Sequence, residues 1–93
     1  MNIKDIRKKI LPVLKKYEVS KAALFGSIVR GEDTKGSDID LLIEFRGKKS
    51  LLDLAGLKIE LEGILKKRVD VLTYNSLYPL LRDKILDEQE AIL

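Results

Sequence analysis

Apolar side chains recur at helical spacing near the start of the chain and predict a first helix over residues 3–17. Its apolar positions are Ile3, Ile6, Ile10, Val13, Leu14 and Tyr17. Asn2 and Asp5 fit an N-terminal cap and a first-turn acid. Pro12 lies inside the pattern and cannot donate an amide hydrogen bond to residue 8. We therefore expect a kink, or two short helices with Pro12 in the first turn of the second.

Three short apolar runs predict strands over residues 21–25, 38–45 and 69–73. The middle run gives the clearest signal, because two sets of its residues alternate and so lie on opposite faces of a strand. One set is Ile39, Leu41, Ile43 and Phe45, and the other is Asp38, Asp40, Leu42 and Glu44. Between the first two runs, residues 27–31 predict a brief helix that Gly31 stops, and residues 32–36 predict a polar loop.

Capping signals predict two more helices. Ser50 and Asp53 form a capping-box start, and a broad apolar stripe follows them. The stripe consists of Leu51, Leu54, Ala55, Leu57, Leu61, Ile64 and Leu65. We expect Asn75 or Ser76 to cap a last helix, with Pro79 tolerated in its first turn. Its expected buried side is Leu77, Leu80, Leu81, Ile85 and Leu86.

The order of these elements is helix, strand, short helix, strand, helix, strand, helix. This order predicts an α+β (mixed α/β) fold, in which helices cover a small three-stranded mixed sheet. Ninety-three residues fit one domain over residues 1–93, with no segment left for a second, acceptor-binding lobe. We therefore expect a partner protein to complete any site that the chain carries.

Two missing residue types limit the chemistry of the chain. It has no cysteine, so it can form neither a disulfide nor a thiolate metal site. It has no histidine, which excludes histidine-based general catalysis and a histidine-ligated zinc site. Carboxylates are then the only strong side-chain metal ligands, and hard cations such as Mg²⁺ or Mn²⁺ are the natural candidates.

The charges are scattered. Lys and Arg number 18 against 15 Asp and Glu, a net charge of +3. The basic residues stand in pairs and one triplet without aromatic interleaving, which favours solvated faces over a nucleic-acid surface. No signal peptide, transmembrane run or lipidation motif is visible, so we expect a cytoplasmic protein. Many Lys and Glu with few Asn, Gln and Met are typical of a thermophile.

Three carboxylates stand on predicted strands where acids are disfavoured. Asp38 and Asp40 are two residues apart, so both point to one face, about 7 Å apart along the backbone. Two anions this close repel each other unless a cation lies between them. Asp70, flanked by two valines, can join the pair if its strand aligns with theirs. Three convergent carboxylates can hold two divalent cations, as in a two-metal phosphoryl-transfer site.

A Gly-Ser turn supplies the other half of the candidate site. Gly26 ends the first predicted strand and permits close approach of the backbone, and Ser27 opens a short helix with a hydroxyl donor. Such a turn favours an anion such as phosphate. Arg30, on the same short helix, can neutralise triphosphate oxygens or brace a carboxylate, although an ordinary surface ion pair is an alternative.

These motifs together resemble the polymerase-beta-type nucleotidyltransferases, and most closely the minimal nucleotidyltransferases. The matching residues are Phe25-Gly26-Ser27, Arg30-Gly31, Ser37-Asp38-Ile39-Asp40-Leu41 and Val69-Asp70-Val71, with ten residues between Ser27 and Asp38. Members of this family are the antitoxin partners in HEPN–nucleotidyltransferase toxin–antitoxin pairs. The resemblance covers nearly the whole chain and implies a nucleotidyltransferase fold.

The resemblance also implies roles for six residues. Asp38, Asp40 and Asp70 match the metal-binding and catalytic triad, and Gly26, Ser27 and Arg30 match the nucleotide-binding residues. The implied reaction uses two Mg²⁺ ions, takes AMP from ATP, and transfers it to a hydroxyl, a tyrosine, of a HEPN toxin, which is thereby neutralised.

Two other functions stay open from the sequence. One is a non-catalytic antitoxin that masks the toxin by binding it. The other is a nucleotidyltransferase that acts on RNA or on a small molecule, which we favour less because such enzymes usually carry an additional substrate-binding domain. The base preference, the number of AMP units transferred and the homo- or hetero-oligomeric state are also open.

Overall fold

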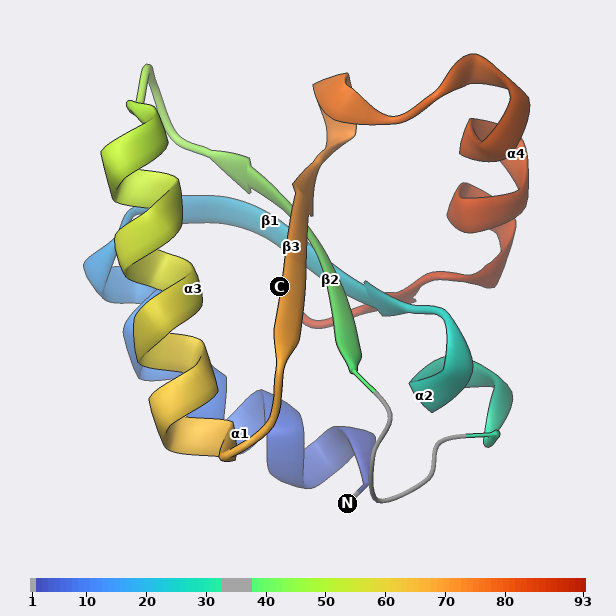
Figure 1. Cartoon of the computed structure of the whole chain (residues 1–93), viewed down its shortest axis with the longest axis horizontal. Coiled ribbons are helices and arrows are strands. Elements are labelled where there is room, and N and C mark those ends of the chain that lie inside the picture. Colours follow the sequence, from blue (N-terminus) through green and yellow to red (C-terminus); the bar gives the residue numbers. More distant parts are fainter. Residues whose placement is uncertain (1, 33–37) are drawn as a thin grey trace.

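A four-stranded mixed sheet lies at the centre of the computed structural model, which describes residues 2–32 and 38–93. The strands are β1 (Val19–Phe25), β2 (Ile39–Phe45), β3 (Val69–Thr73) and β4 (Glu90–Ala91), in the order β3-β2-β1-β4 (Figure 1). β1 is antiparallel to both β2 and β4, and β2 is parallel to β3. The predicted α+β architecture with a mixed sheet is therefore confirmed.

The predicted number of strands is wrong by one. β4 pairs with β1 through Ala23 and Leu24, but two residues are too few to show any alternation in the sequence. Ile92 follows β4, is 3% exposed, and donates its backbone N–H to the carbonyl oxygen of Ala22 at 2.8 Å. β1 also begins earlier than predicted, because the strand continues through a register shift between Val19 and Lys21.

The helices follow the predicted order. They are α1 (Ile3–Lys16), α2 (Ser27–Arg30), α3 (Leu51–Leu65), the 3-10 turn η1 (Tyr74–Ser76) and α4 (Pro79–Glu88). Asn2 caps α1 by accepting the Asp5 amide at 2.9 Å, as predicted. The alternative of two short helices is wrong, because α1 runs unbroken through Pro12, which is exposed on the side of the helix away from the core. No helix in the described ranges is long and apolar enough to span a lipid bilayer.

One face of the sheet packs against α1 and α3, which Figure 1 shows on one side of the strands while α2 and α4 lie on the other. The buried side chains between them include Ile6, Ile10, Leu14, Leu24, Ile39, Leu41, Ile43, Leu57 and Leu61. Because neighbours along a strand point to opposite faces, Asp40 and Asp70 project away from this core. The hydrophobic packing of α1 and α3 thus leaves the acidic positions on the second face.

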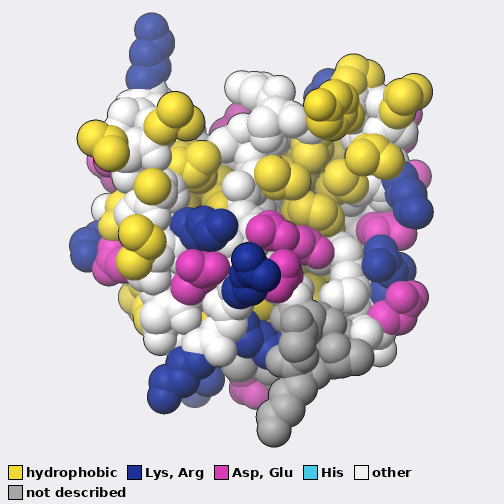
Figure 2. Space-filling view, in the orientation of Figure 1, with side chains coloured by type: hydrophobic (Ala, Val, Ile, Leu, Met, Phe, Trp, Pro, Cys, Tyr) yellow, Lys and Arg dark blue, Asp and Glu magenta, His cyan; other side chains and the backbone are white. Residues whose placement is uncertain are grey.

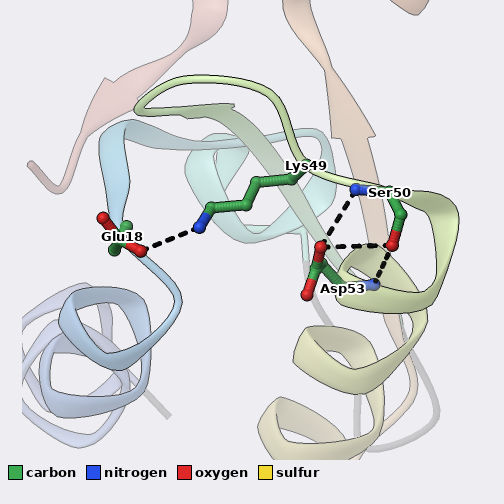
Figure 3. A network of polar contacts seen from close by, with 4 residues as sticks. All are labelled: Glu18, Lys49, Ser50 and Asp53. Carbon is green, nitrogen blue, oxygen red and sulfur yellow. Dashed lines mark hydrogen bonds and ion pairs between the residues drawn. The ribbon is translucent and has the colours of Figure 1, made fainter.

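The capping box at the start of α3 is confirmed (Figure 3). The Ser50 Oγ accepts the Asp53 amide at 3.3 Å, and Asp53 Oδ2 accepts the Ser50 amide at 3.0 Å. Beside it, Lys49 Nζ pairs with Glu18 Oε1 at 2.8 Å. Three predicted stripe positions of α3 are wrong, because Leu51 is 83% exposed, Ile64 is 40% exposed and Ala55 is exposed as well.

Residues 74–89 connect β3 and β4, which are opposite edges of the sheet. Pro79 lies in the first turn of α4, as predicted, but the predicted cap is wrong, because Tyr78 is the N-cap and has no side-chain cap bond. The predicted burial of this helix is wrong for Leu80 and Leu81, whereas Leu77, Ile85 and Leu86 are half-buried. None of its side chains is fully buried, and Leu80 is 96% exposed.

The outer edge of β3 is covered by two side chains. Glu62 Oε2 accepts the Val69 amide at 2.9 Å, and Ser76 Oγ accepts the Thr73 amide at 3.2 Å. Ser76, expected as a helix cap, is thus used to close the strand. Both amides would otherwise be unpaired at the edge of the sheet.

Candidate active site

Asp38 and Asp40 stand at the start of β2, where the chain enters the sheet from residues 33–37, which lie outside the described residues. Asp38 directly precedes the strand, and Asp40 is its second residue. In the parallel ladder, Asp40 is aligned with Asp70 of β3. Aligned residues of neighbouring strands project on the same face, so the two carboxyl groups lie side by side. A shared site requires that β2 and β3 align Asp40 with Asp70. The structure shows this alignment, which the sequence alone does not establish.

The charge of Asp40 is unfavourable in this setting. Burial, first, and then the neighbouring Asp70 and Asp38 carboxylates raise the pKa of Asp40 from 3.8 to about 6, while Arg30 partly opposes the rise. Both effects penalise the ionised form. A cation placed between the carboxylates would remove the repulsion, which makes the cluster a candidate cation-binding site.

The Gly26 turn lies directly against this cluster. Phe25, the residue before it, is aligned with Asp40 across β1 and β2. Gly26 has φ 76° and ψ −149°, and a Cβ built on it would overlap Asp40 Oδ2. Any other residue would thus be strained and would collide with the carboxylate. The glycine brings the backbone of the turn next to the acidic cluster, where Ser27 opens α2.

Arg30 ends α2 on the same side as Asp40. Its Nη1 pairs with Glu88 Oε2 of α4 at 3.1 Å, and its Nε pairs with Glu32 Oε1 at 3.3 Å. Gly31, at φ 72°, stops the helix immediately afterwards, as predicted. The alternative of an ordinary ion pair therefore describes the contacts that Arg30 makes here, and a role toward phosphate stays a prediction.

The donor set fits a hard cation, since the side-chain ligands on offer are carboxylate oxygens. In the described part of the chain, no three acidic side chains are already arranged to hold a metal ion. Asp40 and Asp70 are aligned with each other, and Asp38 acts electrostatically on Asp40. The residues therefore fit a cation held by the Asp40 and Asp70 carboxylates. Asp38 would have to move toward this pair to become a third ligand.

One cavity of the described residues lies elsewhere. It measures about 510 Å³ and is lined at the far end of β2 and β3 by residues such as Phe45, Lys49 and Tyr74. The three carboxylates do not line it. The candidate site is therefore identified here by charge and strand alignment.

Sequence reasoning missed Glu88, which lies 58 positions from its partner Arg30. Its only signal is an acid near the end of the last helix, and many surface acids share that signal. The close contact between Gly26 and Asp40 was also missed, because only the alignment of β1 with β2 reveals it.

Comparison with known proteins fits this geometry. A relative from Methanocaldococcus jannaschii, provisionally named a protein adenylyltransferase, is 56% identical over 93 residues and is covered completely, as is this chain. A solved structure provisionally called a minimal nucleotidyltransferase superposes with a TM-score of 0.83 at 36% identity, covering 97% of this chain and 95% of the other.

A more distant structure shares the fold. It is described as a tri-AMPylated Shewanella oneidensis HEPN toxin in complex with MNT antitoxin, and it matches with a TM-score of 0.75 at 18% identity over 97% of this chain and 71% of the other. The family model "Polymerase beta, Nucleotidyltransferase" matches residues 8–93. With this match and the relative that is 56% identical, the chain belongs to the polymerase beta nucleotidyltransferase family.

Proposed function

We propose that this protein is an antitoxin that transfers AMP from ATP to a hydroxyl, a tyrosine, of a cognate HEPN toxin and so neutralises it. The observation that carries the proposal is the placement of Asp40 and Asp70 side by side, directly against the Gly26 turn. In that arrangement, a triphosphate bound at the Gly26 turn would lie next to cations bound at the two carboxylates. The names of the M. jannaschii relative and of the S. oneidensis complex support the acceptor class.

The residues of the turn would hold the nucleotide. Gly26 has no side chain, so triphosphate oxygens can reach the backbone, and the Ser27 hydroxyl can donate to one of them. Arg30 offers positive charge from the end of α2. These three residues bind and orient the phosphates without taking part in bond making.

Asp38, Asp40 and Asp70 would hold two Mg²⁺ ions, or Mn²⁺ in their place. Divalent cations there stabilise charge on the triphosphate and lower the pKa of an acceptor hydroxyl. Asp70 is exposed, whereas Asp40 is half-buried, so Asp70 is the carboxylate that an arriving acceptor meets. We assign to Asp70 the acceptance of the hydroxyl proton, and Asp38 and Asp40 would hold the cations together with it.

A protein acceptor suits the surface around the site. Figure 2 shows acidic side chains gathered over β2 and β3, with hydrophobic side chains beyond them over the start of α3 and over α4. The exposed apolar side chains of these two helices include Leu51, Leu52, Tyr78, Leu80 and Leu81. A protein can bury such exposed apolar side chains on binding, whereas an RNA or a small metabolite cannot cover them in this way.

We place the reaction in the cytoplasm, where ATP is available.

The proposal is tested by searching the neighbouring reading frames for a HEPN toxin and by measuring labelled-ATP transfer to that protein in Mg²⁺. We expect the wild type to label the toxin and to restore growth, and Asp38→Asn to lose at least roughly 100-fold in rate, as the removal of a metal ligand requires. Co-purification measures whether the complex still forms. Equal labelling of unrelated proteins by the isolated chain would contradict a dedicated partner.

The same variant separates catalysis from masking, which the exposed apolar surface also permits. If Asp38→Asn binds the toxin but no longer neutralises it, AMP transfer is the mechanism. If the variant neutralises the toxin as fully as the wild type, the protein acts by masking, and the proposal of catalysis is wrong.

A further inference from the structure

Arg30 is held by two carboxylates from different parts of the chain. Glu88 of α4 pairs with its Nη1 at 3.1 Å, and Glu32, just after α2, pairs with its Nε at 3.3 Å. The side chain of Arg30 is 41% exposed, and that of Glu88 is 26% exposed. The guanidinium therefore faces solvent while two of its three nitrogens are already paired with anions.

The same guanidinium also acts electrostatically on Asp40 of the acidic cluster. It opposes the rise in the pKa of Asp40, so it lies within electrostatic reach of that carboxylate. An anion bound at the Gly26 turn, four residues earlier on the same short helix, would approach Arg30 as well. Such an anion and Glu88 would then share one cation.

We propose that Glu88 competes with the triphosphate for Arg30 and so sets the affinity of the site for nucleotide. The inference rests on the proposed function, because it takes the Gly26 turn as the place of the triphosphate. Glu88 is a positioning residue and touches no reacting atom: its ion pair keeps Arg30 partly neutralised until a nucleotide displaces it.

The packing of α4 allows this exchange at little cost. None of the side chains of α4 is fully buried, so a shift of Glu88 would expose no core. Directly after the helix, Gln89 accepts a hydrogen bond from the Tyr74 hydroxyl at 3.1 Å, and β4 follows in the sheet. The end of α4 is thus anchored, while the Glu88 side chain is free to turn away from Arg30.

The test measures binding of Mg²⁺ and AMP-PNP, a non-hydrolysable ATP analogue, to the full chain by calorimetry at low salt. Glu88→Gln keeps the size of the side chain and removes its charge. We expect it to bind AMP-PNP about two- to five-fold more tightly than the wild type, the range for an exposed ion pair. The gain should shrink at high salt, because salt screens the pair.

Two matched variants separate competition from general charge effects. Asp87→Asn removes the same charge from the neighbouring position of α4, where the carboxylate makes neither ion pair to Arg30. Glu18→Gln breaks an ion pair of similar length, to Lys49. Both should bind AMP-PNP as the wild type does. In an Arg30→Gln background, which itself weakens binding, Glu88→Gln should have no further effect.

The results that would overturn the inference differ from the result that would overturn the proposed function. Unchanged or weaker binding by Glu88→Gln overturns the inference, as does a gain of equal size in Asp87→Asn or a gain that persists without Arg30. If the wild type binds no AMP-PNP at any Mg²⁺ concentration, the proposed function itself fails. Thermal melting without nucleotide reports the fold of every variant, so a loss of structure is not mistaken for a loss of affinity.

Discussion

Gly26 is the residue on which the geometry of the site depends most directly. Its positive φ and its contact with Asp40 are two separate reasons why a side chain is excluded. Gly31 shares the positive φ, 72° against 76°, but a Cβ there would meet nothing within 4 Å. The two glycines thus form a natural pair for separating backbone strain from steric overlap.

We expect Gly26→Ala to destabilise the protein clearly more than Gly31→Ala. The Gly31 variant should cost about 1 kcal/mol from its backbone conformation alone. The Gly26 variant adds the displacement of Asp40, so it should cost more and should also weaken Mg²⁺ binding. Urea unfolding measures both variants. Equal losses in stability would show that the overlap with Asp40 is relieved freely.

Asp40 links the site to pH. A carboxyl group whose pKa is higher in the folded than in the unfolded chain binds its proton more tightly when folded. Because the pKa rises from 3.8 to about 6, the folded state loses stability as pH rises through this window. The sign is opposite to that of a salt-bridged acid. A bound cation would remove this loss of stability at neutral pH.

Asp40→Asn should therefore stabilise the metal-free protein at pH 8, by roughly 1 kcal/mol once the partial exposure of Asp40 is allowed for. At pH 4 the difference should almost vanish, because Asp40 is then largely protonated in the folded state. Urea unfolding in EDTA at the two pH values provides the measurement. A variant that is less stable than the wild type at pH 8 would contradict the proposed repulsion.

At the scale of elements, α3 and α4 show what an apolar pattern can and cannot tell. In α3, Leu57, Leu61 and Leu65 are buried as their spacing predicts. In α4 the same kind of spacing predicted burial of Leu80, which is 96% exposed. The spacing reveals which side of a helix is apolar, but not whether this chain or another covers that side. The wrong prediction for α4 thus points to an exposed apolar surface on this helix.

Truncations in the two helices should differ accordingly. Leu57→Ala removes a fully buried side chain and should cost about 2–5 kcal/mol in unfolding free energy. Leu80→Ala should change the stability of the isolated chain by less than about 0.5 kcal/mol. Thermal or urea unfolding of the single chain tests both. A large loss for Leu80→Ala would mean that α4 packs more closely than its exposure indicates.

At the scale of the molecule, sequence predicted the parts that depend on neighbours in the chain. The Ser50 capping box, the glycine end of α2 and the bounds of β3 all follow from a few adjacent residues. Contacts between distant segments were not predictable. β4 and the ion pair of Arg30 with Glu88 exist only because residues 74–89 carry the chain from one edge of the sheet to the other.

The alignment of Asp40 with Asp70 lies between these cases. The acids were visible on their strands, and a shared site required only that the strands be neighbours in register. Sequence patterns seldom fix that register, because a shift of two residues keeps every side chain on its face. The parallel pairing of Ile39 with Val69 decides it.

The β3 edge of the sheet also restricts how the protein can associate. Glu62 and Ser76 occupy the first and last outward amides of β3, while the two-residue β4 forms the opposite edge. A neighbouring chain therefore finds little free backbone amide at β3 for strand addition. The exposed apolar side chains that a partner can contact are instead those of Leu51, Leu52 and α4. We therefore expect a partner to bind this protein by packing a helix against these helices.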